Sequence, residues 1–141
     1  MHQASSAIDI ATSGQRLYEF TRTIARWVEE QGIETGLLTL FCRHTSASLL
    51  IQENAAPEVK DDLVAFFASL APEGRHYAHD DEGPDDMPAH AKSSITKTSE
   101  TIPVGKGQLL LGTWQGIYVW EHRNRAHRRS LIVHVAGETA K

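Results

Sequence analysis

The sequence has little cysteine, no long apolar run and no excess of positive charge, and each shortage excludes a class of protein. A single cysteine, Cys42, excludes an internal disulfide and suits a reducing compartment, so we expect a cytoplasmic protein. No apolar stretch approaches the roughly 20 residues that a membrane-spanning helix needs, and we expect no membrane partner. The first six residues show no basic region followed by an apolar one, so we expect no secretory signal. A net charge of −4 argues against nucleic-acid binding through bulk electrostatics.

The 141 residues are enough for one domain with a hydrophobic core, and the sequence shows no internal repeat or domain boundary. Apolar residues spaced three and four apart predict amphipathic helices over residues 16–31 and 57–70. Short alternating or continuous apolar segments predict strands over residues 4–12, 36–44, 48–53, 99–104, 108–113, 117–121 and 130–136. Residues 72–92 form a long polar connection, of a kind that is usually functional or disordered. We therefore predict one α+β domain over residues 1–141, a mostly antiparallel sheet with two main helices packed on one side.

The most informative segment is the acidic loop, residues 79–90, which places five carboxylates between two histidines. These charges would lose hydration in an ordinary core, so the segment is either a solvated loop or a site for a cation or cationic group. Pro88 suits the first turn of a helix, which would put Asp86 and His90 on one face at a spacing of four. A carboxylate and an imidazole that converge in this way can bind a divalent metal ion or relay a proton. The acidic loop alone leaves its two interpretations evenly matched.

Cys42 and His44 form a second candidate. On a strand they would point the same way, about 7 Å apart, and could present both side chains to a metal ion or His44 alone to a substrate. For this pair alone we favour a core cysteine and a histidine that ends the strand with a hydrogen bond. If His44 joins His79 and His90, three imidazoles would favour zinc, whereas carboxylates favour magnesium, calcium or manganese. Ser46 lies in the polar turn that follows, where it could bind phosphate or only shape the turn.

The third candidate is the basic segment, residues 122–129, with four arginines and two histidines in an otherwise acidic protein. Guanidinium groups bind phosphate in a bidentate manner, so an anionic substrate group is a natural partner for Arg123 and its neighbours. The alternative, slightly favoured by composition, is a hairpin turn whose arginines pair with the acidic loop. The nearby aromatic residues Trp114, Tyr118 and Trp120 are more typical of a core or an interface than of substrate stacking.

Four motifs give the sequence a resemblance to a known family. They are FCRHTSASL from Phe41, QENAAP from Gln52, EGPDDMPAHAKSS from Glu82 and LGTWQGIY from Leu111. Their length and order closely match the YjbQ-like family, whose members are often described as secondary thiamine-phosphate synthase enzymes, and the similarity spans essentially the whole chain. The sequence departs from the usual pattern at Ala56, where an acidic residue is common, and at Ala91, where a residue such as isoleucine is usual. Both departures leave the polar positions intact.

The resemblance implies a compact α+β subunit that assembles as a homotrimer, with a polar pocket near the subunit boundaries. It also implies a weak ability to join an aminopyrimidine diphosphate to a thiazole phosphate, which forms thiamine phosphate and releases pyrophosphate. The catalytic candidates that carry over are His44, Asn54, Asp86 and His90. The candidates for substrate binding are Ser46 and the Glu-His-Arg motif formed by Glu121, His122 and Arg123.

The leading hypothesis from the sequence is a trimeric, metal-assisted enzyme that acts on a phosphorylated small molecule. The expected cofactor is a divalent ion, magnesium or zinc, and its expected ligands are His44, His90 and Asp86, with His79 as a fourth candidate. The ion and Arg123 would stabilise the departing pyrophosphate, so that the thiazole nitrogen captures the pyrimidine methylene. Two alternatives stay open. One is metal-dependent hydrolysis with His90 or Asp86 as the base, and the other is a non-catalytic site for a phosphorylated metabolite.

Overall fold

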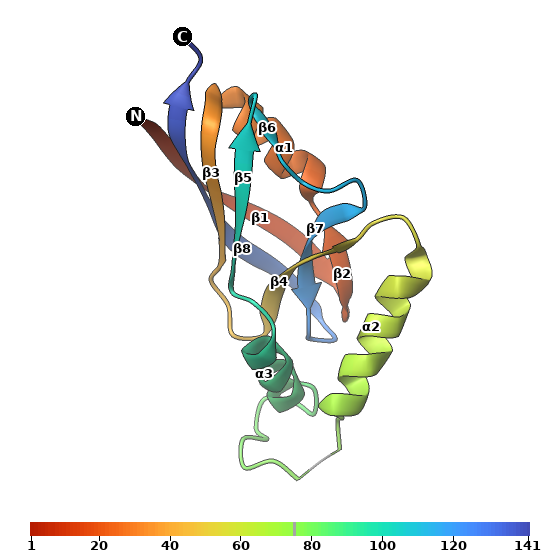
Figure 1. The fold of residues 1–141 in the computed structure, drawn as a ribbon. Coiled ribbons are helices and arrows are strands. Elements are labelled where there is room, and N and C mark those ends of the chain that lie inside the picture. The colour runs from red at the N-terminus through yellow and green to blue at the C-terminus, as the bar shows by residue number, and fades with distance from the viewer. Residues whose placement is uncertain (75) are drawn as a thin grey trace.

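The computed structural model describes residues 1–74 and 76–141, and within these residues two antiparallel sheets curl around a shared core (Figure 1). The larger sheet has five strands, in the spatial order β1 (His2–Ser13), β8 (Ala126–Thr139), β3 (Ile33–Cys42), β5 (Ser99–Gly105) and β6 (Gln108–Leu109). The smaller sheet has the order β2 (Arg16–Glu19), β7 (Gln115–Glu121) and β4 (Ala47–Glu53). The predicted α+β class with a mostly antiparallel sheet is confirmed.

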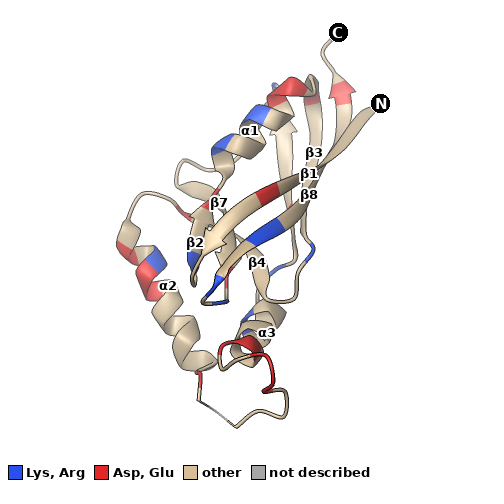
Figure 2. Cartoon of the chain, turned by 180° about the vertical axis from the view of Figure 1, so that it is seen from behind, with Lys and Arg blue, Asp and Glu red and all other residues tan. Residues whose placement is uncertain are grey.

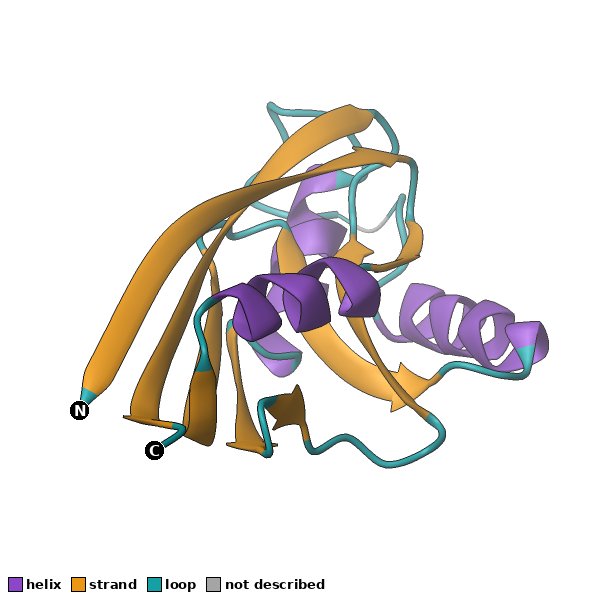
Figure 3. Ribbon diagram, turned by 90° about the horizontal axis from the view of Figure 1, so that it is seen from above, coloured by secondary structure: helices purple, strands orange, loops and turns teal. Residues whose placement is uncertain are grey.

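The described residues also form three helices: α1 (Thr21–Glu30), α2 (Pro57–Leu70) and α3 (Asp86–Ile95). Seen from above, α1 lies across the inner face of the curled sheet (Figure 3), where Ile24 and Val28 are fully buried. Both α2 and α3 lie at the end of the molecule away from the two termini (Figure 1). None of these helices, in the part of the chain that is described, is long and apolar enough to cross a membrane.

The core is formed where α1 faces the strands. On β3, Leu38 and Leu40 are fully buried and pack in the same cluster as Ile24 of α1. The alternate residues Leu37 and Phe41 point to the other face, and each is 47% exposed. Each fully buried leucine contributes about 2 kcal/mol of hydrophobic stabilisation, so this inner face holds the sheet and α1 together. The prediction that this segment is a central strand is confirmed, because β3 lies between β8 and β5.

The predicted helix over residues 16–31 is wrong at its start. Residues Arg16 to Glu19 form the strand β2, and the helix begins only at Thr21. The reason is tertiary, because β2 pairs with β7 from Arg16 opposite Glu121 to Glu19 opposite Tyr118. This pairing satisfies the backbone of the segment and overrides its helical spacing of apolar residues.

The predicted connection over residues 72–92 is also wrong in part, because its last residues belong to α3, which runs on to Ile95. The helical turn expected at Pro88 is therefore the first part of a ten-residue helix. Arg75, in the same predicted connection, lies outside the described residues. Two strand ends differ as well: β3 stops at Cys42, before His44, and the strand expected over residues 108–113 is only Gln108–Leu109.

Strands β3 and β8 come unusually close at Gly36 and Gly137, which are partners in the register. A methyl group on Gly137 would overlap the carbonyl oxygen of Thr35 and the Cα atom of Gly36. These are backbone atoms of a hydrogen-bonded ladder, so they cannot move aside as a flexible side chain can. The contact therefore requires glycine at this position.

We expect Gly137→Ala to lower the free energy of unfolding by about 2–3 kcal/mol, because the added methyl group overpacks the ladder. Urea denaturation of the purified variant measures this. The matched control is Gly105→Ala on β5, where the added methyl group meets only the flexible side chain of Leu110. Equal stabilities of the two variants would show that the close approach of β3 and β8 is not a constraint.

Candidate functional site

Four side chains from the acidic loop and α3 converge near the start of α3, and we call them the Asp86 cluster. They are His79, Glu82, Asp86 and His90, and one ligand atom of each lies within 4.8 Å of the others. Asp86 is buried at the centre, with its Oδ2 atom 2.8 Å from Nε2 of His79 and 3.2 Å from Nε2 of His90. Figure 2 shows the acidic loop in red next to α3, at one end of the molecule. The structure thus brings together three of the four predicted metal ligands and adds Glu82.

The backbone determines how His90 faces the cluster. Its Nδ1 atom lies 2.9 Å from the carbonyl oxygen of Thr45, which can only accept a hydrogen bond, so Nδ1 carries a proton. In a neutral ring the lone pair is then on Nε2, the atom that points at Asp86. A carbonyl bonded to the far nitrogen is the usual arrangement of a metal-binding histidine, because it sets the tautomer and the orientation of the ring.

Arg123 clamps the first turn of α3. Its Nε atom donates to Asp85 at 2.9 Å, Nη1 donates to Asp86 at 2.7 Å and Nη2 donates to the carbonyl oxygen of Glu82 at 2.9 Å. All three guanidinium nitrogens are therefore bonded to the protein rather than presented to a substrate. The alternative drawn from composition, in which arginines of the basic segment pair with the acidic loop, is confirmed for Arg123. The hairpin turn expected there is wrong, because the segment leads from β7 in the smaller sheet to β8 in the larger one.

The groups around Asp86, His79 first among them, keep it ionised. Burial of Asp86 by itself opposes ionisation, but the hydrogen bond from His79 and the charges of His90 and Arg123 outweigh it and hold the pKa of Asp86 below its ordinary value. In return, the hydrogen bond to Asp86 raises the pKa of His79, although burial acts against it. The cluster therefore has a carboxylate at its centre that is ionised at neutral pH, which is the charge state that a metal ligand needs.

Two of the predicted substrate-binding residues, Glu121 and Ser46, belong to a buried ion-pair network. Glu121 is fully buried and pairs with the guanidinium of Arg129, and the hydroxyl of Thr12 donates to the same carboxylate. Burial opposes ionisation of Glu121, but the bonds from Arg129 and Thr12 outweigh it and lower its pKa. Arg129 also donates to the backbone oxygen and the hydroxyl of Ser46, at 3.2 and 3.1 Å.

His122 is the third of these candidates, and it also faces the interior. It is 1% exposed, and its Nε2 atom lies 2.9 Å from the hydroxyl of Ser48. Its Nδ1 atom has no hydrogen-bond partner among the described residues. Burial, helped by the charge of Lys92, lowers the pKa of His122 to about 3, so the ring is neutral at physiological pH.

The structure does not bring the remaining two candidates into the Asp86 cluster. The Nε2 atom of His44 accepts a hydrogen bond of 2.8 Å from the backbone N–H of Ser130, although His44 does line a cavity together with His90. Asn54 follows β4 at the end opposite to Ala47, where its side chain donates to the carbonyl oxygen of Gln115. At about 3.3 Å per strand residue, the length of β4 puts Asn54 about 20 Å from Ala47.

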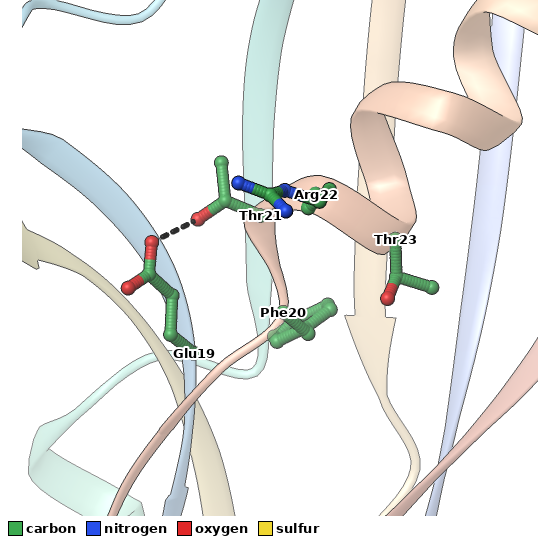
Figure 4. A pocket seen from close by; sticks show the side chains of 5 residues that line it. All are labelled: Glu19, Phe20, Thr21, Arg22 and Thr23. Carbon is green, nitrogen blue, oxygen red and sulfur yellow. Dashed lines mark hydrogen bonds between the residues drawn. The ribbon is translucent and has the colours of Figure 1, made fainter.

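Asn54 has a different cavity nearby. This cavity has a volume of about 280 Å³ at the start of α1 and is lined by Glu19, Phe20, Thr21, Arg22 and Thr23 (Figure 4). The hydroxyl of Thr21 donates to Glu19 at 2.9 Å, and the Glu19 carboxylate lies over Gly116, next to Asn54. The roles predicted for Asn54 and His44 stay predictions.

Sequence reasoning missed Glu82 and Asp85, and both depend on the shape of the acidic loop. Gly83 has a positive φ of 101°, a conformation that glycine adopts readily, and it turns the chain between these two acidic residues. After the turn, Glu82 faces the cluster while Asp85 accepts from Arg123. The signal available in the sequence was Gly83, which indicates a turn between acidic residues. The spacing of residues along the sequence did not predict which carboxylate would face the cluster and which would bind Arg123.

Comparisons with known proteins agree along nearly the whole chain. The family model described as UPF0047 protein YjbQ-like matches residues 6–138. The chain belongs to the YjbQ-like UPF0047 family. UPF0047 protein sll1880 from Synechocystis sp. is 57% identical over 137 residues, which is 96% of this chain and 93% of the relative. UPF0047 protein YjbQ from Escherichia coli O157:H7 is 47% identical over 106 residues, 75% of this chain and 77% of the relative.

Solved structures of the YjbQ-like family share the fold. An uncharacterised YjbQ/UPF0047 protein from Clostridium acetobutylicum superposes with a TM-score of 0.86 at 32% identity, over 93% of this chain and 99% of that one. A protein of unknown function from Sulfolobus solfataricus gives a TM-score of 0.85 at 25% identity, over 97% and 100% of the two chains. These relatives carry no named reaction, so membership of the family confirms the fold and leaves the reaction to be inferred from the site.

Because the pKa of His122 is lowered to about 3, we expect acid to destabilise the protein through this residue. Between pH 6.5 and about 3 the unfolded chain binds a proton at His122 that the folded chain does not, so stability falls as the pH is lowered. From pH 6.5 to 5.0 the loss is about 2 kcal/mol. His122→Gln removes the titrating group and should flatten this dependence in urea denaturation at several pH values. His2→Gln, at an exposed histidine, should keep the wild-type slope, and an unchanged slope in His122→Gln would refute the assignment.

Proposed function

We propose that the chain is a divalent-metal-dependent enzyme that acts on a phosphorylated small molecule, with the Asp86 cluster holding the ion. The observation that supports this most directly is that His79 and His90 both direct Nε2 at the same oxygen of a buried, ionised Asp86. The donor set of two imidazoles and two carboxylates fits zinc or another transition metal best. Magnesium, which prefers oxygen ligands, is the alternative ion.

The residues in and around the Asp86 cluster have separate tasks in this proposal. A bound ion supplies positive charge that polarises a phosphoryl oxygen of the substrate. Arg123 holds the carboxylate of Asp86 in place, and the carbonyl of Thr45 holds His90 in the tautomer whose Nε2 atom would face a bound ion. A bound ion, rather than Arg123, would supply the positive charge for the substrate phosphate, because the guanidinium nitrogens of Arg123 are already bonded.

Within this class we propose the thiamine-phosphate synthase reaction that the family resemblance implies. The bond between the pyrimidine methylene and its diphosphate breaks, the electron pair leaves with pyrophosphate, and the thiazole nitrogen forms the new carbon–nitrogen bond. This step needs stabilisation of a leaving anion and little proton transfer. Both needs suit a site whose main contribution is the positive charge of a bound ion. It also needs no protein nucleophile. The thiol of Cys42 is 2% exposed, and burial raises its pKa, so it is not activated.

We also propose that the protein is a cytoplasmic homotrimer. Large apolar side chains remain exposed in the single chain, among them Trp114 at 62% and Phe66 at 56%. Trp114 lies beside Asn54, whose backbone N–H donates to the carbonyl oxygen of Trp114. An interface that covers Trp114 would place Asn54 at a subunit boundary, where it could reach a neighbouring chain. Size-exclusion chromatography with light scattering tests the assembly, and a monomer at micromolar concentration would contradict it.

We expect Asp86→Ala and His90→Ala each to abolish metal binding and thiamine-phosphate formation, because each removes a central ligand. The measurements are metal titration by calorimetry and product analysis after incubation with both substrates. Asp61→Ala, at an exposed aspartate of α2, is the control for loss of one negative charge and should behave as the wild type.

The products distinguish the alternatives. Pyrophosphate release without thiamine phosphate would favour hydrolysis, and metal-dependent phosphate binding without turnover would favour a non-catalytic site. Wild-type activity in both variants of the Asp86 cluster, with the assembly unchanged, would exclude the cluster as the active site.

We expect Arg123→Gln to lower the affinity for the metal ion by about tenfold or more, because residues that hold metal ligands in place typically have effects of this size. Calorimetric titration with Zn²⁺ and with Mn²⁺ measures it, after circular dichroism has shown that the variant is folded. Arg125→Gln, at an exposed arginine of the same loop between β7 and β8, is the matched control. If both variants bind the ion as the wild type does, the clamp has no role in ordering the cluster.

A further inference from the structure

A groove runs from His90 to the exposed end of β3, and we call it the His44 groove. It consists of two adjoining cavities with volumes of about 240 and 450 Å³. The smaller cavity is lined by His44, Thr45, His90, Ser93, Ser94 and Thr98. The larger shares His44, Thr45 and Thr98 with it and adds Phe41, Cys42 and Arg43. Three shared lining residues make the two cavities one continuous surface.

The lining of the groove differs chemically from one end to the other. In the smaller cavity, His44 and the hydroxyls of Thr45 and Thr98 are hydrogen-bond donors of the kind that phosphate oxygens accept. The other lining residues are already bonded: His90 donates to Thr45, and the hydroxyls of Ser93 and Ser94 donate to backbone carbonyls. The larger cavity has the ring of Phe41, 47% exposed, and the exposed Arg43. Among the described residues that line either cavity there is no aspartate or glutamate, although the chain has 18 acidic residues.

The absence of carboxylates distinguishes the groove from the cavity that borders His79, the other histidine of the Asp86 cluster. That cavity, of about 270 Å³, includes His79 and Asp80 in its lining. A phosphate there would approach an exposed carboxylate, and like charges repel. On the side of the His44 groove, an anion meets His44, hydroxyl groups and Arg43 instead. Electrostatics therefore favours the groove as the approach of an anionic substrate to the cluster.

We propose that the His44 groove binds a phosphorylated small molecule with a planar ring. The phosphate lies in the smaller cavity beside His90, and the ring lies in the larger cavity against Phe41, with Arg43 adding positive charge. This inference rests on the proposed function, because the phosphate then lies next to the Asp86 cluster. It assigns specificity for a ring to Phe41, a residue to which the sequence motifs gave no role.

The test uses inorganic phosphate and phenyl phosphate as probes, each titrated calorimetrically into the full-length protein with and without Mn²⁺. We expect the wild type to bind phenyl phosphate about fivefold more tightly than inorganic phosphate, as an aromatic contact would give. Phe41→Ala should remove this preference. Leu37→Ala is the matched control, because Leu37 lies on the same face of β3 and is equally exposed but lines neither cavity.

The charge of Arg43 is tested separately. We expect Arg43→Gln to weaken binding of both probes about threefold and to reduce the dependence of affinity on salt, because a surface cation is screened by salt. Arg22→Gln removes the same charge from the cavity at the start of α1 and should leave both affinities unchanged. Equal affinity of the wild type for the two probes, or equal effects of Phe41→Ala and Leu37→Ala, would overturn the proposal.

Metal titration distinguishes failure of this inference from failure of the proposed function. Phe41→Ala and Arg43→Gln should bind Mn²⁺ as the wild type does, because neither residue belongs to the Asp86 cluster. If the wild type binds no ion but still prefers phenyl phosphate, the groove stands as a binding site and the metal-dependent function fails. If the ion binds and the preference for phenyl phosphate is absent, the function stands and the groove fails.

Discussion

The buried carboxylate of Glu121 is the constraint on which the arrangement around the Asp86 cluster depends. A fully buried charge is strongly destabilising unless it is paired and hydrogen-bonded, so its partners have to be held in position. They come from distant parts of the chain: the hydroxyl of Thr12 on β1, the guanidinium of Arg129 on β8 and the backbone N–H of Arg123. Glu121 ends β7 in the smaller sheet, whereas β1 and β8 belong to the larger one. One charge thus joins the two sheets.

The candidate site follows from that junction. Because the N–H of Arg123 is bonded to Glu121, its side chain is directed at the start of α3, where it binds Asp85 and Asp86. The same Asp86 carboxylate lies against the Nε2 atoms of His79 and His90, so acidic and basic side chains alternate outward from the core. The same junction fixes the loop after β3, since Arg129 holds Ser46 next to the residue whose carbonyl orients His90. Rigid support of this kind is what a metal site requires of its surroundings.

This arrangement divides the polar residues of the family motifs into two groups. Glu121, His122 and Ser46 look like substrate-binding residues in the sequence, but their buried contacts hold the fold together. Asp86 and His90 have ligand atoms directed at a shared point, and they carry the proposed chemistry. The groove beside them is lined from the loop after β3 and from α3, so a substrate there would touch the two segments that Glu121 and Arg123 place side by side. The two groups thus distinguish residues that support the fold from residues with a proposed role in the reaction.

The sequence by itself determined the α+β class, the central strand β3, the helix α2 and the spacing of Asp86 and His90. Each of these depends on local periodicity or on residues within a few positions of one another, and such patterns can be read along a chain. Only the tertiary structure decided that residues 16–19 pair with β7 rather than begin a helix, because their partner lies about 100 residues away. It also decided that Arg123 binds Asp85, 38 residues earlier, and that His44 bonds Ser130 instead of joining the cluster. Which donor meets which acceptor depends on how the sheets pack, and spacing along the sequence does not contain that information.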